Sequence, residues 1–218
     1  MILAIEAVLC ATRAFTSGAC FKYGSGNFSI FEYRVEALEA IYGQVSSSSL
    51  SGEVDSAVLE NIVLAALQVP DHKHVGLWRF LTISGDARQN LGALYARAKL
   101  TEDSSLGSSA LEKIRNKPLR APLIVVVCVT KRAKVSEVER LLSTGAVKQN
   151  MLLAAYAQGV GAKWRVGSMA YSRVVCDGLG LAEKEKIAGF LYLGENDSNV
   201  ESKELIDPGK YVTAWTAD

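Results

Sequence analysis

The stretch P-L-I-V-V-V-C-V-T, Pro122 to Thr130, decides the fold. It is continuously apolar and rich in β-branched residues, which favour extended backbone. Strict alternation of apolar and polar residues would indicate a strand with one face in water. An unbroken apolar run instead predicts a strand buried on both faces. We therefore expect this strand at the centre of a sheet that helices cover.

Regular patterns extend outward from this strand in both directions. Apolar periodicity and helix start and stop residues predict the other elements. They are helices over 35–42, 53–69, 86–98 and 111–117, strands over 77–84 and 186–194, and a long helix over 136–159. Asp86 is the expected N-cap of the third helix, and a polar linker is expected over 101–109. Helices come first and strands then alternate with helices, which is typical of the α+β class.

The long helix from Ser136 to Gly159 has an unusual surface. Gly145 and Ala146, and then the run from Met151 to Ala157, make it apolar nearly all round. A helix with apolar residues on every side is buried. We therefore expect it to lie inside the molecule or inside a dimer.

Composition bounds the function. The 218 residues suffice for one domain, and the net charge of +1 comes from interspersed acids and bases. Such a balance predicts no binding to nucleic acid or to an anionic membrane, and no apolar run reaches the roughly 18 residues that span a bilayer. The four cysteines have no paired spacing, which predicts free thiols in the reducing cytoplasm, and two histidines argue against a metal site.

The first 34 residues differ from the rest and are expected to form an N-terminal extension outside a domain of residues 35–218. Glu6 and the late Arg13 do not fit a secretory signal. The scarcity of acidic residues is compatible with an organelle transit peptide. The alternative is a loosely packed arm.

Two stretches combine side chains that bind ligands. P-D-H-K, Pro70 to Lys73, ends in a histidine and a lysine that can both donate hydrogen bonds, or else forms a surface turn capped by Asp71. G-A-K-W-R-V-G, Gly161 to Gly167, sets Trp164 and Arg165 between glycines. Either the glycines admit a ligand while Arg165 meets a phosphate, or the tryptophan packs in the core and the arginine forms a surface ion pair.

In their order along the chain, these stretches resemble the nitroreductase family, and most closely its compact, YdjA-like branch. The similarity runs from about Val35 to Gly194. It rests on A-L-E-A-I, L-E-N-I-V-L-A-A-L-Q-V-P-D-H-K, L-W-R-F-L-T-I-S-G-D-A-R-Q-N-L-G, A-P-L-I-V-V-V, the segment 134–167 and K-I-A-G-F-L-Y-L-G. The resemblance implies a nitroreductase-like α+β fold with a central mixed sheet flanked by helices, and a homodimer with shared sites.

The resemblance also implies the cofactor and the residues that hold it. Members bind FMN without a covalent bond, and by position Trp164, Arg165 and Val166 contact it in one subunit. Gln68 and His72 match contacts expected from the partner subunit, and His72 or Lys73 is a candidate donor to the flavin pyrimidine. The stretch that matches a nicotinamide nucleotide contact is Ala154, Ala155, Tyr156, Ala157, Gln158 and Gly159. In this reading the glycines around Trp164 clear room beside the flavin.

The implied activity is that of an FMN-dependent NAD(P)H oxidoreductase. NAD(P)H passes hydride to the flavin in a ping-pong mechanism, and nitroaromatic, quinone or similar acceptors take up the electrons. No side chain is expected as a catalytic acid or base, because the chemistry belongs to the cofactor.

One departure from the family pattern bears on FMN binding. Relatives carry an R-R-S motif whose arginine helps to hold the FMN phosphate, and here Gln44, Val45 and Ser46 occupy those positions. Gln68 likewise stands where relatives often have arginine. A charge-assisted hydrogen bond is worth about 1.5–3 kcal/mol, so its loss weakens FMN binding by roughly 10- to 150-fold. The alternative function is therefore a flavin-fold binding or regulatory protein without redox turnover.

Overall fold

The structure is a computed structural model of the chain, and it describes residues 35–70, 76–131, 135–196 and 206–216. The extension of residues 1–34 lies outside the described residues, as do His72 and Lys73. Of the described helices, none combines the length and the hydrophobicity that crossing a membrane requires.

A five-stranded sheet forms the centre of the molecule. Its strands are β1 (Leu50–Ser51), β2 (Trp78–Ser84), β3 (Leu123–Thr130), β4 (Gly161–Arg165) and β5 (Glu185–Asn196). The path runs β1-β5-β3-β2, and β4 also pairs with β5. The ladders between these strands are antiparallel, and the parallel sense is found in a bridge between Ser46 and Ala162.

Strand β3 confirms the prediction made from its sequence. It lies between β2 and β5, and all side chains from Ile124 to Cys128 are fully buried. Its side chains alternate between two cores. Ile124, Val126 and Cys128 belong to one, and Leu123, Val125 and Val127 belong to the other. An unbroken apolar run is what a strand with a core on each face requires.

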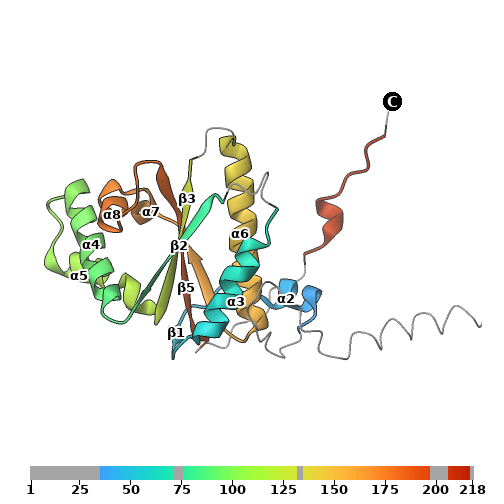
Figure 1. The fold of residues 1–218 in the computed structure, drawn as a ribbon, viewed down its shortest axis with the longest axis horizontal. Coiled ribbons are helices and arrows are strands. Elements are labelled where there is room, and N and C mark those ends of the chain that lie inside the picture. The colour runs from blue at the N-terminus through green and yellow to red at the C-terminus, as the bar shows by residue number, and fades with distance from the viewer. Residues whose placement is uncertain (1–34, 71–75, 132–134, 197–205, 217–218) are drawn as a thin grey trace, which may run out of the picture. The chain divides into compact units, whose positions relative to one another are not determined.

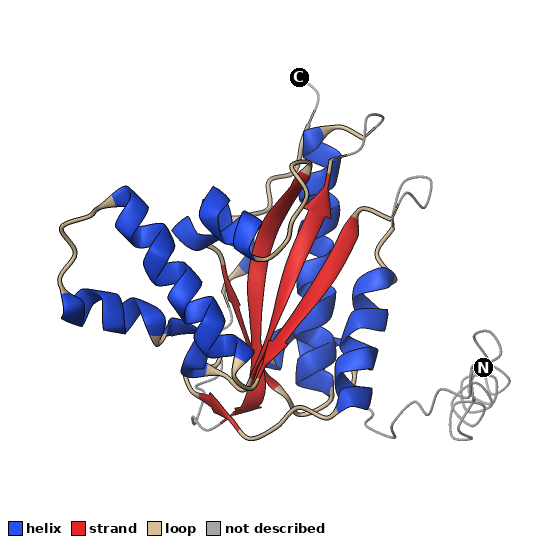
Figure 2. Ribbon diagram, turned by 60° about the vertical axis from the view of Figure 1, so that its left-hand side comes forward, coloured by secondary structure: helices blue, strands red, loops and turns tan. Residues whose placement is uncertain are grey.

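Helices cover both faces of the sheet (Figures 1 and 2). One face packs against α3 (Ser56–Leu67) and α6 (Glu137–Ala157), and α2 (Ala37–Gly43) lies against α6. The other face carries α4 (Ala87–Glu102), α5 (Ser108–Arg115), η2 (Lys117–Arg120), α7 (Ser168–Tyr171) and α8 (Arg173–Gly178). A last turn, η3 (Pro208–Lys210), lies near the C-terminus. The predicted α+β class is confirmed.

Helix α6 begins with a capping box. The Ser136 hydroxyl accepts from the Glu139 backbone N–H at 3.1 Å, and the Glu139 carboxylate accepts from the Ser136 N–H at 2.9 Å. By contrast, Asp86 makes no side-chain capping bond to α4. Its backbone is already helical (φ −68°, ψ −22°), whereas a capping side chain needs an extended backbone. The predicted role of Asp86 is therefore wrong, and α4 also extends into the expected linker as far as Glu102.

The two halves of α6 differ in burial. Val147, Met151 and Ala155 are fully buried in the second half, as its sequence predicts. In the first half Leu141 and Leu142 are 67% and 70% exposed. The molecule therefore covers only part of the apolar surface of this helix.

Candidate active site

The stretch from Gly161 to Gly167 contains a strand that the sequence patterns do not predict. Strand β4 pairs antiparallel with β5, with Trp164 opposite Leu191 and Arg165 opposite Phe190. Opposed residues in a ladder share a face, and successive residues alternate. Trp164 therefore packs with the core under α3 and α6, while Arg165 lies on the face that carries α4. Neighbours in the sequence thus serve opposite sides of the sheet.

The glycines around Trp164 have different roles. A Cβ at Gly161 would lie 2.7 Å from the Leu50 side chain and 3.0 Å from the Ser47 hydroxyl. The prediction that this glycine clears room for a ligand is therefore wrong, because the chain itself fills the space. A Cβ at Gly189 of β5 would lie 2.4 Å from the Trp164 indole, so Gly189 is what admits the tryptophan. Gly167 faces open space, with nothing within 4 Å of its Cβ position.

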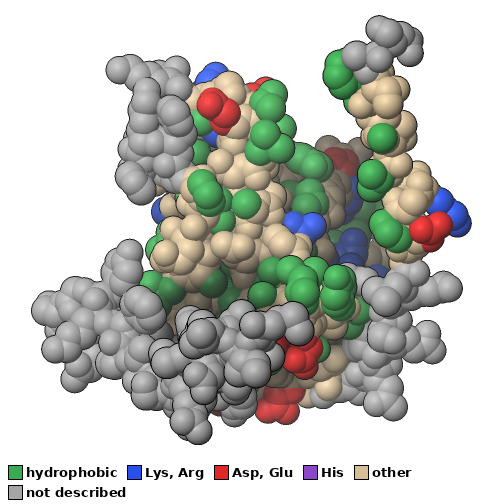
Figure 3. Space-filling view, turned by 90° about the vertical axis from the view of Figure 1, so that its right-hand side faces the viewer, with side chains coloured by type: hydrophobic (Ala, Val, Ile, Leu, Met, Phe, Trp, Pro, Cys, Tyr) green, Lys and Arg blue, Asp and Glu red, His purple; other side chains and the backbone are tan. Residues whose placement is uncertain are grey.

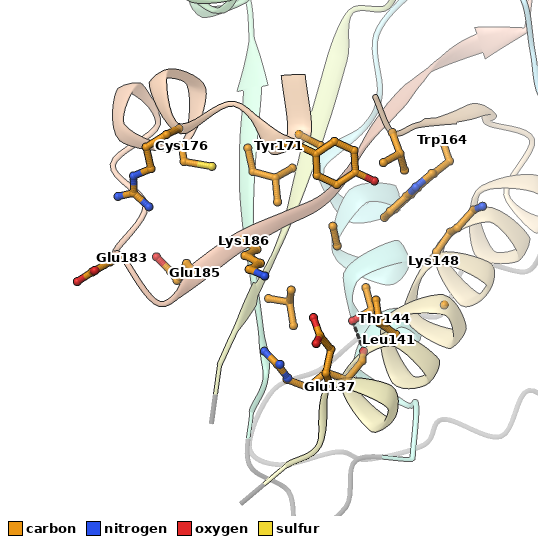
Figure 4. Close-up of a pocket in the computed structure, with 18 residues that line it drawn as sticks. Glu137, Leu141, Thr144, Lys148, Trp164, Tyr171, Cys176, Glu183, Glu185 and Lys186 are labelled. Atoms are coloured by element: carbon orange, nitrogen blue, oxygen red, sulfur yellow. Dashed lines mark hydrogen bonds between the residues drawn. The ribbon is translucent and has the colours of Figure 1, made fainter. Parts of the chain in front are cut away.

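A cavity of about 650 Å³ opens beyond the end of β4. We call it the tryptophan cavity, and its walls include Leu141, Lys148, Trp164, Val166, Tyr171 and Ile187. Side chains of α6 form one side, and α7, α8 and the first residues of β5 form the other (Figure 4). Strand β4 pairs with β5 only from Phe190 onward, which leaves the earlier part of β5 to line the cavity.

Paired charges stabilise the wall of the tryptophan cavity. The Arg79 guanidinium donates two hydrogen bonds to Glu185, at 2.8 and 2.7 Å, and the Ala182 N–H donates a third at 2.9 Å. The bonds from Arg79 hold the pKa of Glu185 below its usual range. Burial raises the pKa of the Cys176 thiol, so this cysteine of the wall is a poor nucleophile at neutral pH.

Two cations of α6 face the same space. The Lys148 ammonium lies 5.8 Å from the centroid of the Trp164 ring, within the range of a cation–π contact. The Nε of Arg140 is buried and makes no hydrogen bond. In the part of the chain that the structure describes, no three His, Cys, Asp or Glu side chains group so that they could hold a metal ion.

A second cavity, of about 150 Å³, lies on the Arg165 side of β4. We call it the cationic cavity, and its walls include Tyr95, Lys117, Arg120, Arg165, Ser168 and Tyr192. The Arg165 guanidinium lies 5.7 Å from the centroid of the Tyr192 ring. Burial raises the pKa of the Tyr192 hydroxyl, and the positive charges of Arg165 and Arg120 partly offset that rise. Val166 lines both cavities, which places them next to each other at the end of β4.

The loop that replaces the expected arginine motif lies beside the start of β4. Gln44 is buried, with 7% of its surface exposed, and Ser46 forms the parallel bridge to Ala162. Val45 is half-buried between them. Gln68 is an exposed residue at the C-terminus of α3, and neither Gln68 nor the loop lines the tryptophan cavity or the small cavity beside Arg165.

The predicted nicotinamide segment, Ala154 to Gly159, lies at the C-terminal end of α6. The Ala155 side chain is fully buried, and the Gln158 amide bonds to Asn61 at 3.1 Å and to the Ala154 carbonyl at 2.8 Å. These residues do not line the tryptophan or cationic cavity. Of the predicted residues, the structure thus brings Trp164, Arg165 and Val166 to the cavities.

Most residues that line the two cavities were not predicted from the sequence, among them Lys117, Arg120, Lys148 and Tyr171. Lys117 and Arg120 belong to a basic run, K-I-R-N-K-P-L-R, that contains no acid. That excess of positive charge is a signal for an anion site. Lys148 and Tyr171 carry no comparable signal, because single side chains of a helix and a short turn show their direction only in the fold.

Comparisons with known proteins agree with this architecture. The model of the nitroreductase family matches residues 51–195, which is more than half of the chain. The chain is 35% identical over 183 residues to "Putative NAD(P)H nitroreductase YdjA" of Escherichia coli (strain K12), and the match covers 82% of this chain and 99% of that protein.

Solved structures show the same fold. A nitroreductase-like family protein from Bacillus cereus superposes with a TM-score of 0.75 at 22% identity, over 84% of this chain and 98% of the other. A nitroreductase with bound FMN from Bacteroides fragilis NCTC 9343 gives a TM-score of 0.63 at 21% identity, over 84% and 100%. The matched family model and the extent of the similarity to YdjA lead to one conclusion: the chain belongs to the nitroreductase family.

Proposed function

We propose that the protein is an FMN-dependent NAD(P)H oxidoreductase of the nitroreductase type. The name of the YdjA relative refers to NAD(P)H, and a solved structure of the same fold contains FMN. The observation that carries the proposal is the pair of cavities that meet at Val166, one large and aromatic and one small and cationic. FMN has a matching division into an aromatic ring system and a phosphate.

The tryptophan cavity suits the ring system. Its volume of about 650 Å³ lies within the range of cavities that hold cofactors and drug-sized ligands. Trp164 and Tyr171 offer aromatic surface, and Val166 and Ile187 offer aliphatic surface. Aromatic rings stack on such surfaces in offset or edge-to-face arrangements. The residues present therefore fit a flavin ring.

Bound FMN would accept hydride from NAD(P)H and pass electrons to a nitroaromatic, quinone or similar acceptor in a ping-pong sequence. The protein holds and orients its ligands and supplies charge. Lys148, which lies 5.8 Å from the centroid of the Trp164 ring, and Arg140, which also lines this cavity, are the candidates for electrostatic stabilisation there. The Arg79–Glu185 pair fixes the opposite wall.

We also propose that the protein works as a homodimer. The face that carries α2, α3 and α6 shows many more hydrophobic than charged side chains (Figure 3). Its exposed large hydrophobic residues are Leu38, Ile41, Tyr42, Leu67, Val138, Leu141 and Leu142. In the described C-terminal segment, Tyr211 and Trp215 are 75% and 87% exposed. Extended apolar surface of this kind marks interaction sites.

A second copy would account for predicted residues that lie away from the cavities of one chain. In this proposal Gln68 and His72 reach the flavin of the partner subunit, Gln44, Val45 and Ser46 lie at its edge, and Ala154 to Gly159 meet the nicotinamide nucleotide. Residues 35–218 then form the FMN-binding domain, and the cytoplasm is its location. Light scattering at micromolar concentration tests the dimer, and a single-chain mass would contradict it.

The flavin absorbance of the purified protein tests the proposed activity. We expect a yellow protein whose flavin bands bleach when NADH or NADPH is added without oxygen, and recover when a quinone is added. A flavin that binds but does not bleach with either nucleotide would instead favour a binding or regulatory protein. A protein that takes up no FMN in equilibrium dialysis would overturn both readings.

A further inference from the structure

The charged residues that line the tryptophan cavity differ in their exposure. Glu137, Glu183 and Lys186 are exposed, so water weakens the field of their charges. Arg140 and Lys148 are half-buried, and both come from α6. Charges in the less hydrated part of a cavity act more strongly on a ligand, because the local dielectric constant is lower.

The half-buried carboxylate of this cavity already has a partner. Glu185 accepts two hydrogen bonds from the Arg79 guanidinium. Arg140 and Lys148, by contrast, form no ion pair with a carboxylate of the described residues. The Lys148 ammonium contacts the neutral ring of Trp164. The half-buried part of the cavity therefore carries positive charge that the described part of the chain does not neutralise.

Arg140 also has an unused hydrogen-bond donor. Its Nε is buried and has no hydrogen-bond partner among the described residues. A buried donor without a partner costs free energy, and a ligand that accepts from it recovers that cost. A guanidinium donates from a planar fork that matches the two oxygens of a carboxylate. Arg140 is therefore suited to bind an acidic group.

Helix α6 sets the spacing between the two cations. Arg140, Thr144 and Lys148 follow one another at intervals of four residues, so they share one face, and two turns, roughly 12 Å, separate the first from the last. The Thr144 hydroxyl accepts from the Trp78 indole N–H at 3.3 Å and donates to the Arg140 carbonyl at 2.6 Å. The cavity thus has an aromatic end, where Lys148 lies beside Trp164 (Figure 4), and a cationic end at Arg140.

We propose that Arg140 selects electron acceptors whose aromatic or quinone ring carries a carboxylate. The ring lies toward Trp164, and the carboxylate accepts hydrogen bonds from the Arg140 guanidinium. This selection rests on the proposed function, because an acceptor is reduced only beside the flavin. NAD(P)H also carries negative charge, but a ribose separates its phosphates from the nicotinamide ring. A carboxylate on the acceptor ring itself stays within the cavity.

A matched pair of acceptors tests this selection. 4-Nitrobenzoate carries a carboxylate, and 4-nitrobenzamide replaces it with a neutral amide of nearly the same size. Steady-state kinetics of the full chain give the ratio of the two kcat/KM values, in which effects common to both acceptors cancel. We expect Arg140→Gln to lower the preference for the acid by about 5- to 30-fold, a range reduced for the partial exposure of Arg140. Arg140→Lys keeps the charge and should retain part of the preference.

Two exposed residues of the same cavity provide the controls. Lys186→Gln should change the ratio by less than about twofold, and Glu137→Gln, which removes a negative charge one turn from Arg140, should raise it. Circular dichroism establishes that each variant is folded. An unchanged ratio in Arg140→Gln, or an equal loss in Lys186→Gln, would overturn the selection while the proposed function stands. A rise in the KM for NAD(P)H without a change in the ratio would assign Arg140 to the nucleotide and overturn it as well.

A binding measurement does not depend on turnover. Isothermal titration calorimetry of the full chain compares benzoate with benzamide, neither of which takes up electrons from a flavin. We expect the wild type to bind benzoate more tightly and Arg140→Gln to lose that preference. If NAD(P)H does not bleach the flavin but the preference for benzoate depends on Arg140, the proposed function fails and the carboxylate site stands. Without such a preference in the wild type, the carboxylate site fails.

Discussion

The two cavities at the end of β4 contrast in size, polarity and charge balance. The tryptophan cavity is about 650 Å³, and in its wall Glu185 is paired with Arg79. The cationic cavity is about 150 Å³ and gathers three cations without a carboxylate among its described residues. One strand of five residues supplies Trp164 to the first and Arg165 to the second. Adjacent residues can therefore contribute to a site through different physical effects.

This difference predicts how ligand contacts in each of the two cavities should respond to salt. Contacts to Trp164 depend on buried nonpolar area and shape, so they should be insensitive to salt. Contacts to Arg165 depend on charge, so they should weaken as ionic strength rises. Substitutions at Trp164 and at Arg165 should therefore have different effects, and measuring both tests whether the two cavities act independently.

Trp164→Ala should have the largest effect on stability. The indole packs against the core under α6 and fills the space above Gly189, so its removal leaves a cavity. Because the side chain is partly exposed, we expect the free energy of unfolding to fall by about 2–4 kcal/mol, near the lower end for buried aromatic residues. Urea denaturation measures it. Tyr171→Ala, at a side chain that is 77% exposed, is the control and should cost under about 0.5 kcal/mol. Equal costs would mean that Trp164 is not a core residue.

Arg165→Ala should act on the ligand and spare the fold. We expect FMN occupancy to fall at least about tenfold, as the loss of one charge-assisted contact predicts, with little change in circular dichroism. Lysine should rescue only in part, since it keeps the charge but not the planar guanidinium. The remaining FMN affinity should also depend less steeply on salt. Full flavin content in the alanine variant would make Arg165 a structural residue.

Gly189→Ala should perturb the tryptophan side alone. The new methyl group would meet the Trp164 indole at 2.4 Å, and we expect a loss of about 1–3 kcal/mol in the free energy of unfolding. Gly145→Ala is the matched control, because its Cβ position in α6 is open and alanine favours a helix by about 0.5–1 kcal/mol. Opposite signs in chemical denaturation are the expected result. A neutral Gly189→Ala would mean that Trp164 moves freely.

The Arg79–Glu185 pair should give the smallest effect, and one that depends on pH. The pKa of Glu185 is lower in the folded protein than in the unfolded chain, where it is about 4.3. The pair therefore stabilises the fold above that pH, and the stabilisation is lost as the pH falls through the folded pKa of Glu185. Arg79 is 41% exposed, so we expect only about 1–2 kcal/mol for Glu185→Gln at pH 7. The difference from wild type should vanish in strong acid. Glu183→Gln, on the same cavity wall, is the control and should change the free energy of unfolding by less than about 0.5 kcal/mol.

Most of the fold could be predicted from local patterns. The unbroken apolar run of β3 predicted a strand buried on both faces, and the apolar periodicity predicted the long helix α6. Strand β4 was not predicted, because its pairing with β5 is long-range and its glycines resemble a turn. The role of Asp86 could not be predicted from the sequence either. A residue caps a helix with its side chain only when its backbone is extended, and the backbone conformation is known only from the structure.

The candidate site could be predicted only in part. The resemblance indicated Trp164, Arg165 and Val166, and the structure places all three at the cavities. It could not show that the side chains diverge, which follows from the alternation of β4. Nor could it show Lys117 and Arg120, because they reach Arg165 only when η2 folds against the end of a strand some forty residues later in the chain.

The alternation of β4 also sets how this region can evolve. A substitution at Trp164 can change the tryptophan cavity without altering Arg165, and a substitution at Arg165 can change the cationic cavity without altering Trp164. A one-residue insertion between α6 and β4 has a different outcome, because a shift of one position in register exchanges the two faces. We therefore expect the length of the link from Gln158 to Val160 to be constrained, so that homologues vary there by substitution rather than by insertion or deletion.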